Sequence, residues 1–133
     1  MLFNKLGYET RSLVVKYKLK DLPEEVKFIP DQIDYHHALQ IRIGKAWRII
    51  DATYDSKLKG QGFRVNIWDG ISATQLAEEP LKIKTGNEKN QEFEDEFRGF
   101  IKRLKIAMKE HEREIKNYTK KFNQILESYR NNL

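Results

Sequence analysis

The residues best suited to chemistry in this chain are a histidine and an aspartate on two neighbouring predicted strands. His37 lies in the run 35–43, Asp51 lies in the run 46–53, and Gly44-Lys45 separates the two runs. A carboxylate that holds one imidazole nitrogen fixes the tautomer of the ring and raises its basicity, which leaves the other nitrogen free to activate a nucleophile. The pair would supply two members of a catalytic triad. The alternative is a purely structural polar pair at a sheet edge.

The hairpin between these strands decides whether the two side chains meet. A two-residue turn at Gly44-Lys45 would pair His37 with Ala52, whereas a three-residue loop over 43–45 would pair His37 with Asp51. The second register places apolar residues beside apolar residues on one face and polar residues on the other. Because a shift of one residue turns every side chain to the opposite face, this pattern favours the second register. We therefore predict that His37 and Asp51 lie opposite each other.

A nucleophile for this pair is missing. The chain contains no cysteine, which excludes disulfides, thiolate metal ligands and a thiol nucleophile. Ser12, Ser56 and Ser72 lie in other parts of the pattern, and none is an evident substitute. The pair is thus a residual dyad, and we do not expect the chain as it stands to be an enzyme.

The pattern predicts an α+β fold in which about four antiparallel strands follow a truncated N-terminal helix. That helix would end before Gly7, a residue suited to a left-handed C-cap. Strands are expected over 8–18, 35–43, 46–53 and 64–68, and a short helix over 74–79. The sheet and its hairpin make up residues 1–84.

Residues 85–133 are predicted to form a long helix or a helix pair. Two apolar seams at helical spacing are offset by one residue: Phe93, Phe97, Phe100, Leu104 and Ala107, then Met108, Ile115, Tyr118, Phe122, Ile125 and Tyr129. A single helix of this length would span roughly 65 Å. The tail is therefore expected either to fold back near 109–114 and cover the sheet, or to project as a coiled coil and self-associate through residues 93–129.

At the hairpin the sequence resembles the transglutaminase-like superfamily, thiol acyl-transfer enzymes with a papain-type Cys–His–Asp triad. Members share a histidine before a small residue, then a strand, a tryptophan and an Asp-x-Thr motif. Here these are His37-Ala38, Trp47 and Asp51-Ala52-Thr53. The segments 6–11 and 62–70 are similar to a prokaryotic branch of the same group, and the likeness covers about residues 1–82.

The resemblance implies the C-terminal half of a papain-like fold, with His37 as general base, Asp51 as its orienting partner, and Trp47, Thr53 and Trp68 as supporting residues. In the family, the cysteine begins the helix that precedes this region, so its counterpart would lie before Met1. Two functions follow. The chain is either an inactive module that binds a peptide or protein, or a fragment of an active acyltransferase or protease whose cysteine lies upstream or on another chain.

Composition limits the other functions. The 25 lysines and arginines are interleaved with 20 acidic residues, for a net charge of +5, so nucleic-acid binding is not expected. A basic helical interaction protein remains a weaker alternative, because residues 98–109 carry five basic residues and no acidic one. Three histidines without metal-ligand spacing predict no metal site, and nothing indicates a cofactor. Without a membrane-spanning run or a signal-peptide pattern, we expect a soluble, cytoplasmic protein.

Overall fold

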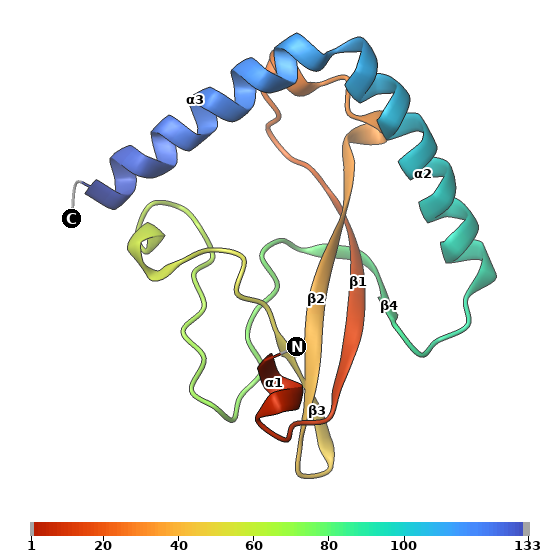
Figure 1. Cartoon of the computed structure of the whole chain (residues 1–133), viewed down its shortest axis with the longest axis vertical. Helices are drawn as coiled ribbons and strands as arrows, with labels where there is room; N and C mark the ends of the chain where they lie inside the picture. Colours follow the sequence, from red (N-terminus) through yellow and green to blue (C-terminus); the bar gives the residue numbers. More distant parts are fainter. Residues whose placement is uncertain (1, 132–133) are drawn as a thin grey trace.

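The computed structural model describes residues 2–131 and shows an antiparallel sheet followed by two long helices (Figure 1). The strand order is β3-β2-β1-β4, and neighbouring strands run antiparallel. A four-residue helix, α1 (Leu2–Lys5), precedes the sheet. The predicted α+β class is confirmed. The strands are β1 (Thr10–Lys18), β2 (Ile33–Ile43), β3 (Ala46–Ile50) and β4 (Pro80–Thr85).

The fourth strand is not the one that the sequence pattern predicted. Residues 64–68 form no strand, and β4 lies at 80–85 instead. The side-chain amide of Asn66 donates to the backbone oxygens of Asp51 and Gln75, at 3.0 and 2.8 Å, so side-chain bonds replace a strand ladder here. The predicted helix over 74–79 is also absent, because the N–H of Ala77 donates to a carboxylate and not to a helical carbonyl.

β4 is an edge strand with an irregularity in its pairing to β1. Lys16 pairs with Lys82, but Tyr17 pairs with Pro80, so Leu81 is an extra residue in the ladder. Proline has no N–H to donate and is tolerated at the first position of a strand, which is where Pro80 lies. The strand is thereby short and kinked at its start.

Apolar residues pack on both faces of the sheet. On one face, Leu13, Val15 and Tyr17 of β1 form a buried cluster. On the other face, Tyr35 of β2 packs against aromatic side chains of the helix α2 (Gln91–Glu110). Because the two faces are both covered in part, β1 and β2 do not show a simple division into one apolar and one polar side.

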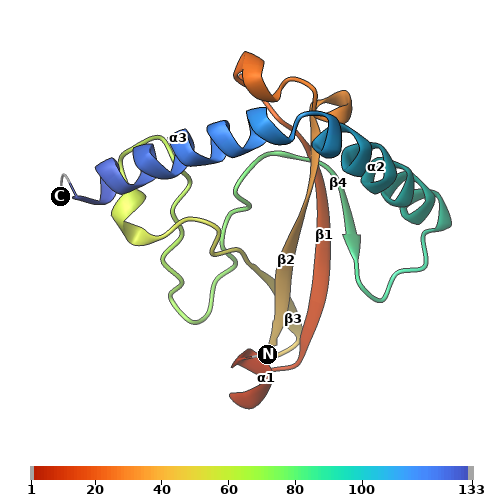
Figure 2. The same ribbon diagram turned by 45° about the horizontal axis from the view of Figure 1, so that its top comes forward.

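The C-terminal segment consists of two helices that meet at His111. The second helix, α3 (Glu112–Asn131), follows α2 after this one residue, whose φ of −117° and ψ of 30° are not helical. The two helices form an arch: α2 runs alongside the sheet, and α3 turns towards the segment around residues 54–63 (Figures 1 and 2). The break lies within the predicted range 109–114, and α2 covers the sheet as one of the two alternatives expected.

The two long helices are amphipathic and not apolar all around. α2 buries Phe93 and Phe100, whereas none of the side chains of α3 is buried. The stripe of α3 that faces the rest of the chain includes Leu126 and not Ile125, which is 46% exposed. Within residues 2–131, no helix is both long enough and apolar enough to cross a membrane.

Gly86, which follows β4, is expected to tolerate no side chain without rearrangement. A Cβ at this position would lie 2.2 Å from the hydroxyl oxygen of Ser12, whose backbone oxygen accepts a hydrogen bond from the N–H of Gly86. We expect Gly86→Ala to lower the free energy of unfolding by about 1–2 kcal/mol, because the serine side chain must move. The measurement is urea denaturation followed by circular dichroism.

Gly99 provides the matched control, since it lies in α2 and a Cβ there would be no closer than 3.7 Å to Arg103. Gly99→Ala is expected to raise the free energy of unfolding by roughly 0.5–1 kcal/mol through helix propensity. Removing the hydroxyl in Ser12→Ala should recover most of the loss caused by Gly86→Ala. A Gly86→Ala protein as stable as the parent would contradict the close approach.

Candidate functional site

The turn between β2 and β3 sets the geometry of the candidate site. The strands are joined by a two-residue turn at Gly44-Lys45, and Leu39 pairs with Ile50. The predicted three-residue loop, with His37 opposite Asp51, is therefore wrong by one residue. Gly44 has a φ of 60° and Lys45 does not have a positive φ, as in a type II′ turn, which takes glycine at its first central position. The turn chemistry thus decided the register against the apolar pattern.

Asp51 contacts His36 and not His37. The distance between Nε2 of His36 and Oδ1 of Asp51 is 3.2 Å. The His37 ring lies on the opposite face of β2 and approaches Phe97 of α2, with 6.4 Å between ring centroids. The predicted pairing of His37 with Asp51 is corrected accordingly: a His–Asp pair is present, but the neighbouring histidine makes it.

The carboxylate of Asp51 is buried and accepts several hydrogen bonds. It is 3% exposed, and its Oδ2 accepts the N–H of Ala77 at 2.9 Å. Its Oδ1 accepts both the N–H of Thr53, at 3.2 Å, and the hydroxyl of Thr53. Burial alone would raise the pKa of Asp51, but the bonds from Thr53 and Ala77, together with His36, outweigh it and hold this pKa below its ordinary value.

The backbone of Asp51 is held by residues that the sequence reasoning did not identify. The N–H of Asp51 donates to the hydroxyl of Thr74 at 2.7 Å, and the N–H of Thr74 donates to the carbonyl of Ile49 at 2.8 Å. Asn66 binds the carbonyl of Asp51, as described above. Asn66 lies in the segment 62–70, to which the resemblance gave no role at this site, and Thr74 lies in a segment without a motif.

Thr53 completes a compact group with His36 and Asp51. Its hydroxyl oxygen lies 3.2 Å from Nε2 of His36, the same nitrogen that faces the carboxylate. One ring nitrogen cannot both donate to Asp51 and serve as the base for Thr53, so the threonine braces the pair and does not act as its nucleophile. Among residues 2–131, Nδ1 of His36 has no hydrogen-bond partner.

An open pocket of about 440 Å³ lies beside this group. It is formed where the chain leaves β3 and diverges from β2. Most of its wall is apolar, and His36 and Asp51 supply polar groups. The residues lining it are Ser12, His36, His37, Ala38, Leu39, Ile50, Asp51, Ala52 and Thr53.

The two tryptophans predicted as supporting residues lie elsewhere. The guanidinium of Arg11 packs over the Trp47 ring, with its Cζ 4.2 Å from the ring centroid. Trp68 packs edge-on against Phe3 and Tyr8, and its indole N–H donates to the carbonyl of Ser72 at 2.8 Å. The structure thus brings Thr53 to the His–Asp pair but places neither tryptophan on the lining of the pocket.

This arrangement can orient an imidazole and offer its second nitrogen to a proton donor or acceptor. The buried carboxylate fixes Nε2, so the ring is held in one orientation. Within the described part of the chain, no three side chains of the metal-ligating types gather at one place. Comparisons of the chain with protein-family models, with curated proteins and with solved structures found no match.

The lowered pKa of Asp51 predicts how stability depends on pH. The unfolded chain takes up a proton near the ordinary aspartate value of about 3.9, whereas the folded chain does so at lower pH. The contribution of Asp51 is therefore fully present above about pH 4 and is lost as the pH falls through its folded pKa. We expect the free energy of unfolding to fall more steeply below pH 4 in the parent than in Asp51→Asn.

Urea denaturation at several values between pH 7 and pH 2.5 would measure this difference. Other carboxylates with lowered pKa values, such as Asp69 at about 2, are common to both proteins and cancel in the comparison. Parallel pH profiles for the two proteins would show that the folded structure does not stabilise the ionised form of Asp51.

Proposed function

We propose that this chain is a transglutaminase-like module that lacks the nucleophile and binds a peptide or protein segment in the pocket beside His36 and Asp51. The observation that carries the proposal is the buried Asp51 carboxylate, which faces Nε2 of His36 at 3.2 Å on the edge of an open pocket. A chain without cysteine does not perform thiol chemistry alone.

The lining of the pocket supports a peptide ligand. Most of the wall is apolar, with Ala38, Leu39 and Ile50 among the lining residues, so an apolar side chain can cover it. His36 lies on the same pocket, and its ring is fixed in place by Asp51. A fixed imidazole can exchange a hydrogen bond with a backbone amide at little entropic cost.

The sequence resemblance supports the same assignment once the register is corrected. The role that the motif gave to His37 passes to His36, while Asp51 and Thr53 keep theirs. The three side chains lie within hydrogen-bonding distance of one another. Trp47 and Trp68 match the family motif but have no role in binding here, since both pack away from the pocket.

A second candidate function is thiol acyl transfer with a cysteine supplied by another chain or by sequence outside these 133 residues. The position of the His36 ring favours it, because Asp51 and Thr53 occupy Nε2 and leave Nδ1 for a proton to be taken from a thiol. In this case the dyad is a working half-site and not a remnant.

Titration with short peptides tests the first function. Capped tripeptides of the form acetyl-Ala-X-Ala-amide, with X apolar or an amide residue, are added while NMR signals of the labelled protein are followed. We expect shifts at Leu39, Thr53 and the His36 ring for at least one peptide, and a loss of affinity of about tenfold in His36→Gln, the effect of one hydrogen bond.

Lys89→Gln is the matched control, because this exposed residue precedes α2 and does not line the pocket. It should leave the affinity unchanged. Absence of shifts for every peptide, or equal affinity in His36→Gln and the parent, would refute peptide binding at this pocket.

Added thiol tests the second function. N-acetylcysteine and p-nitrophenyl acetate react slowly in buffer, and release of p-nitrophenol is followed by absorbance. If His36 activates a thiol, the parent protein should accelerate the reaction several-fold, while His36→Gln and Asp51→Asn should not. Equal rates with the parent and both variants would remove this candidate.

A further inference from the structure

The two long helices are fastened to the rest of the chain in different ways. α2 inserts Phe93 and Phe100, which are 1% and 3% exposed, against Tyr35 of the sheet. Its glutamates at 94 and 96 also pair with Lys84 and Lys16 of the strands. α3 is as long as α2 but has no buried side chain. Apolar burial, the main source of helix stability in proteins, is therefore concentrated in α2.

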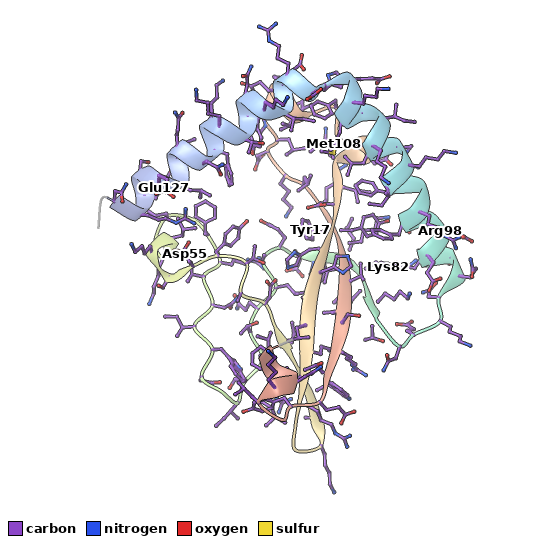
Figure 3. All side chains as sticks on the ribbon, in the orientation of Figure 1. Tyr17, Asp55, Lys82, Arg98, Met108 and Glu127 are labelled. Atoms are coloured by element: carbon purple, nitrogen blue, oxygen red, sulfur yellow. The ribbon has the colours of Figure 1, made fainter. Side chains whose placement is uncertain are left out.

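Among residues 2–131, two ion pairs connect α3 to other parts of the chain. Near its end, Nε and Nη2 of Arg130 both donate to Oδ2 of Asp55, at 3.1 and 2.7 Å. Nearer its middle, Lys121 lies 3.2 Å from Glu25. Exposed ion pairs contribute little to stability, so these contacts place the helix without fixing it strongly. Figure 3 shows Asp55 beneath the end of α3 that carries Glu127.

The junction between the helices is suited to act as a hinge. His111 is the one residue between α2 and α3, and it leaves the helical conformation there. Its ring stacks on Phe28 with 4.3 Å between centroids and an interplanar angle of 9°. The stack holds the start of α3, while the far end is held by Arg130 and by the contact of Tyr129 with Phe63. A change in backbone angles at one residue is enough to swing a helix of this length.

The far end of α3 is linked to the candidate site through a short run of chain. Asp55, which Arg130 binds, follows Thr53 by two residues. Between them, the ring of Tyr54 packs against that of Phe63, with 4.8 Å between centroids. The ring of Phe63 in turn contacts that of Tyr129 of α3, with 6.4 Å between centroids. Thr53 braces the His–Asp pair. The contacts therefore run from α3 to the wall of the pocket without a gap.

We propose that α3 is a strap, hinged at His111 and latched by Arg130 on Asp55, which holds the segment 53–63 and hence the Thr53 wall of the pocket in place. Release of the latch frees α3 and loosens Thr53, while α2 and the sheet stay folded. The strap stands on the contacts alone, but its role as a regulator of the pocket rests on the proposed function. A ligand that binds the ordered pocket should in return hold the strap closed.

Amide hydrogen exchange, followed by mass spectrometry without any ligand, tests the strap. In the parent protein, amides of α3 beyond residue 115 should exchange at least tenfold faster than those of α2 between 97 and 104. Asp55→Asn should speed exchange in α3 and at residues 53–55 about fivefold further, and leave α2 unchanged. Glu112→Gln is the matched control, since its partner Lys116 lies within α3 itself.

Arg130→Gln approaches the latch from the other side and keeps Asp55 intact as the N-cap of the short helix η3 (Ser56–Leu58). It should reproduce the effect of Asp55→Asn. The strap is refuted if the amides of α3 exchange as slowly as those of α2 in the parent. It is also refuted if neither Asp55→Asn nor Arg130→Gln speeds exchange in α3 more than Glu112→Gln does. Because no peptide is present, this outcome is independent of peptide binding, and a failure of the peptide titration leaves the exchange result standing.

Discussion

Replacement of Asp51 by alanine is expected to lower the free energy of unfolding by about 3 kcal/mol. The carboxylate is buried and accepts hydrogen bonds from Ala77 and Thr53. Its removal leaves the buried N–H of Ala77 without a partner, which costs about 1–3 kcal/mol, and opens a small cavity. Urea denaturation at pH 7, followed by circular dichroism, measures the loss.

Asp69→Ala provides the control for this expectation. Asp69 also accepts two backbone N–H groups, from Ile71 and Ser72, but it lies at the surface, where water replaces the lost acceptor. We expect a much smaller loss of stability there, and an intermediate loss for Asp51→Asn, which keeps the shape of the side chain. Equal losses for Asp51→Ala and Asp69→Ala would mean that Asp51 is not an anchor of the fold.

Replacement of Phe93 by alanine should have an effect of similar or larger size, about 4 kcal/mol. Phe93 is 1% exposed and packs edge-on against Tyr35, with 5.7 Å between centroids. It lies in the first turn of α2, beside the N-cap residue Asn90, whose side chain accepts the N–H of Phe93 at 3.0 Å. Loss of this ring would separate the start of α2 from the sheet. The thermal unfolding midpoint and urea denaturation measure the change.

Phe97 is the matched control, because it also contacts Tyr35, at 4.9 Å, but is only half-buried. Phe97→Ala should cost clearly less than Phe93→Ala. A larger loss of stability in Phe97→Ala than in Phe93→Ala would contradict this expectation, as would an unchanged unfolding midpoint in Phe93→Ala. Either result would mean that the buried contact of Phe93 with the sheet does not stabilise the fold.

The sequence was sufficient for the fold class because the long-range pattern is strong. Alternating residues in β1 and β2 predicted strands, and the apolar seam through Phe93, Phe97 and Phe100 predicted the helix that packs on them. The seam identified the correct contact residues of α2. Such periodic signals arise from burial of one face, and in α2 that face carries the buried Phe93 and Phe100.

The register of the hairpin could not be predicted from the same signal. Apolar matching assumes that one face of the hairpin is buried and the other solvated. Here Ile41 is fully buried on one face, while Ala38 packs with Leu13 and Val15 on the other. With apolar residues on both faces, the pattern discriminates weakly, and the preference of Gly44 for a positive φ decides. The two-residue turn that Gly44 favours brings His36, and not His37, to the same face as Asp51.

The surroundings of Asp51 were beyond reach for a different reason. Thr74 and Ala77 bind Asp51 from a loop, through hydrogen bonds that involve backbone groups. Backbone donors carry no residue-type signal, and the loop has no periodicity. The absence of a strand at 64–68 has the same origin, since Asn66 uses its side chain to bind backbone carbonyls across the loop. Contacts of this kind become visible only once the tertiary structure is known.

The irregular start of β4 bears on how copies of this chain meet. An edge strand with free backbone groups can recruit further strands and seed fibrils. Here the proline at position 80, the extra residue Leu81 and the flanking lysines 82 and 84 leave little flat, uncharged edge for another strand to join. The sheet is thus terminated on that side. Strand addition at β4 is therefore disfavoured, and assembly of this protein, where it occurs, would proceed through other surfaces.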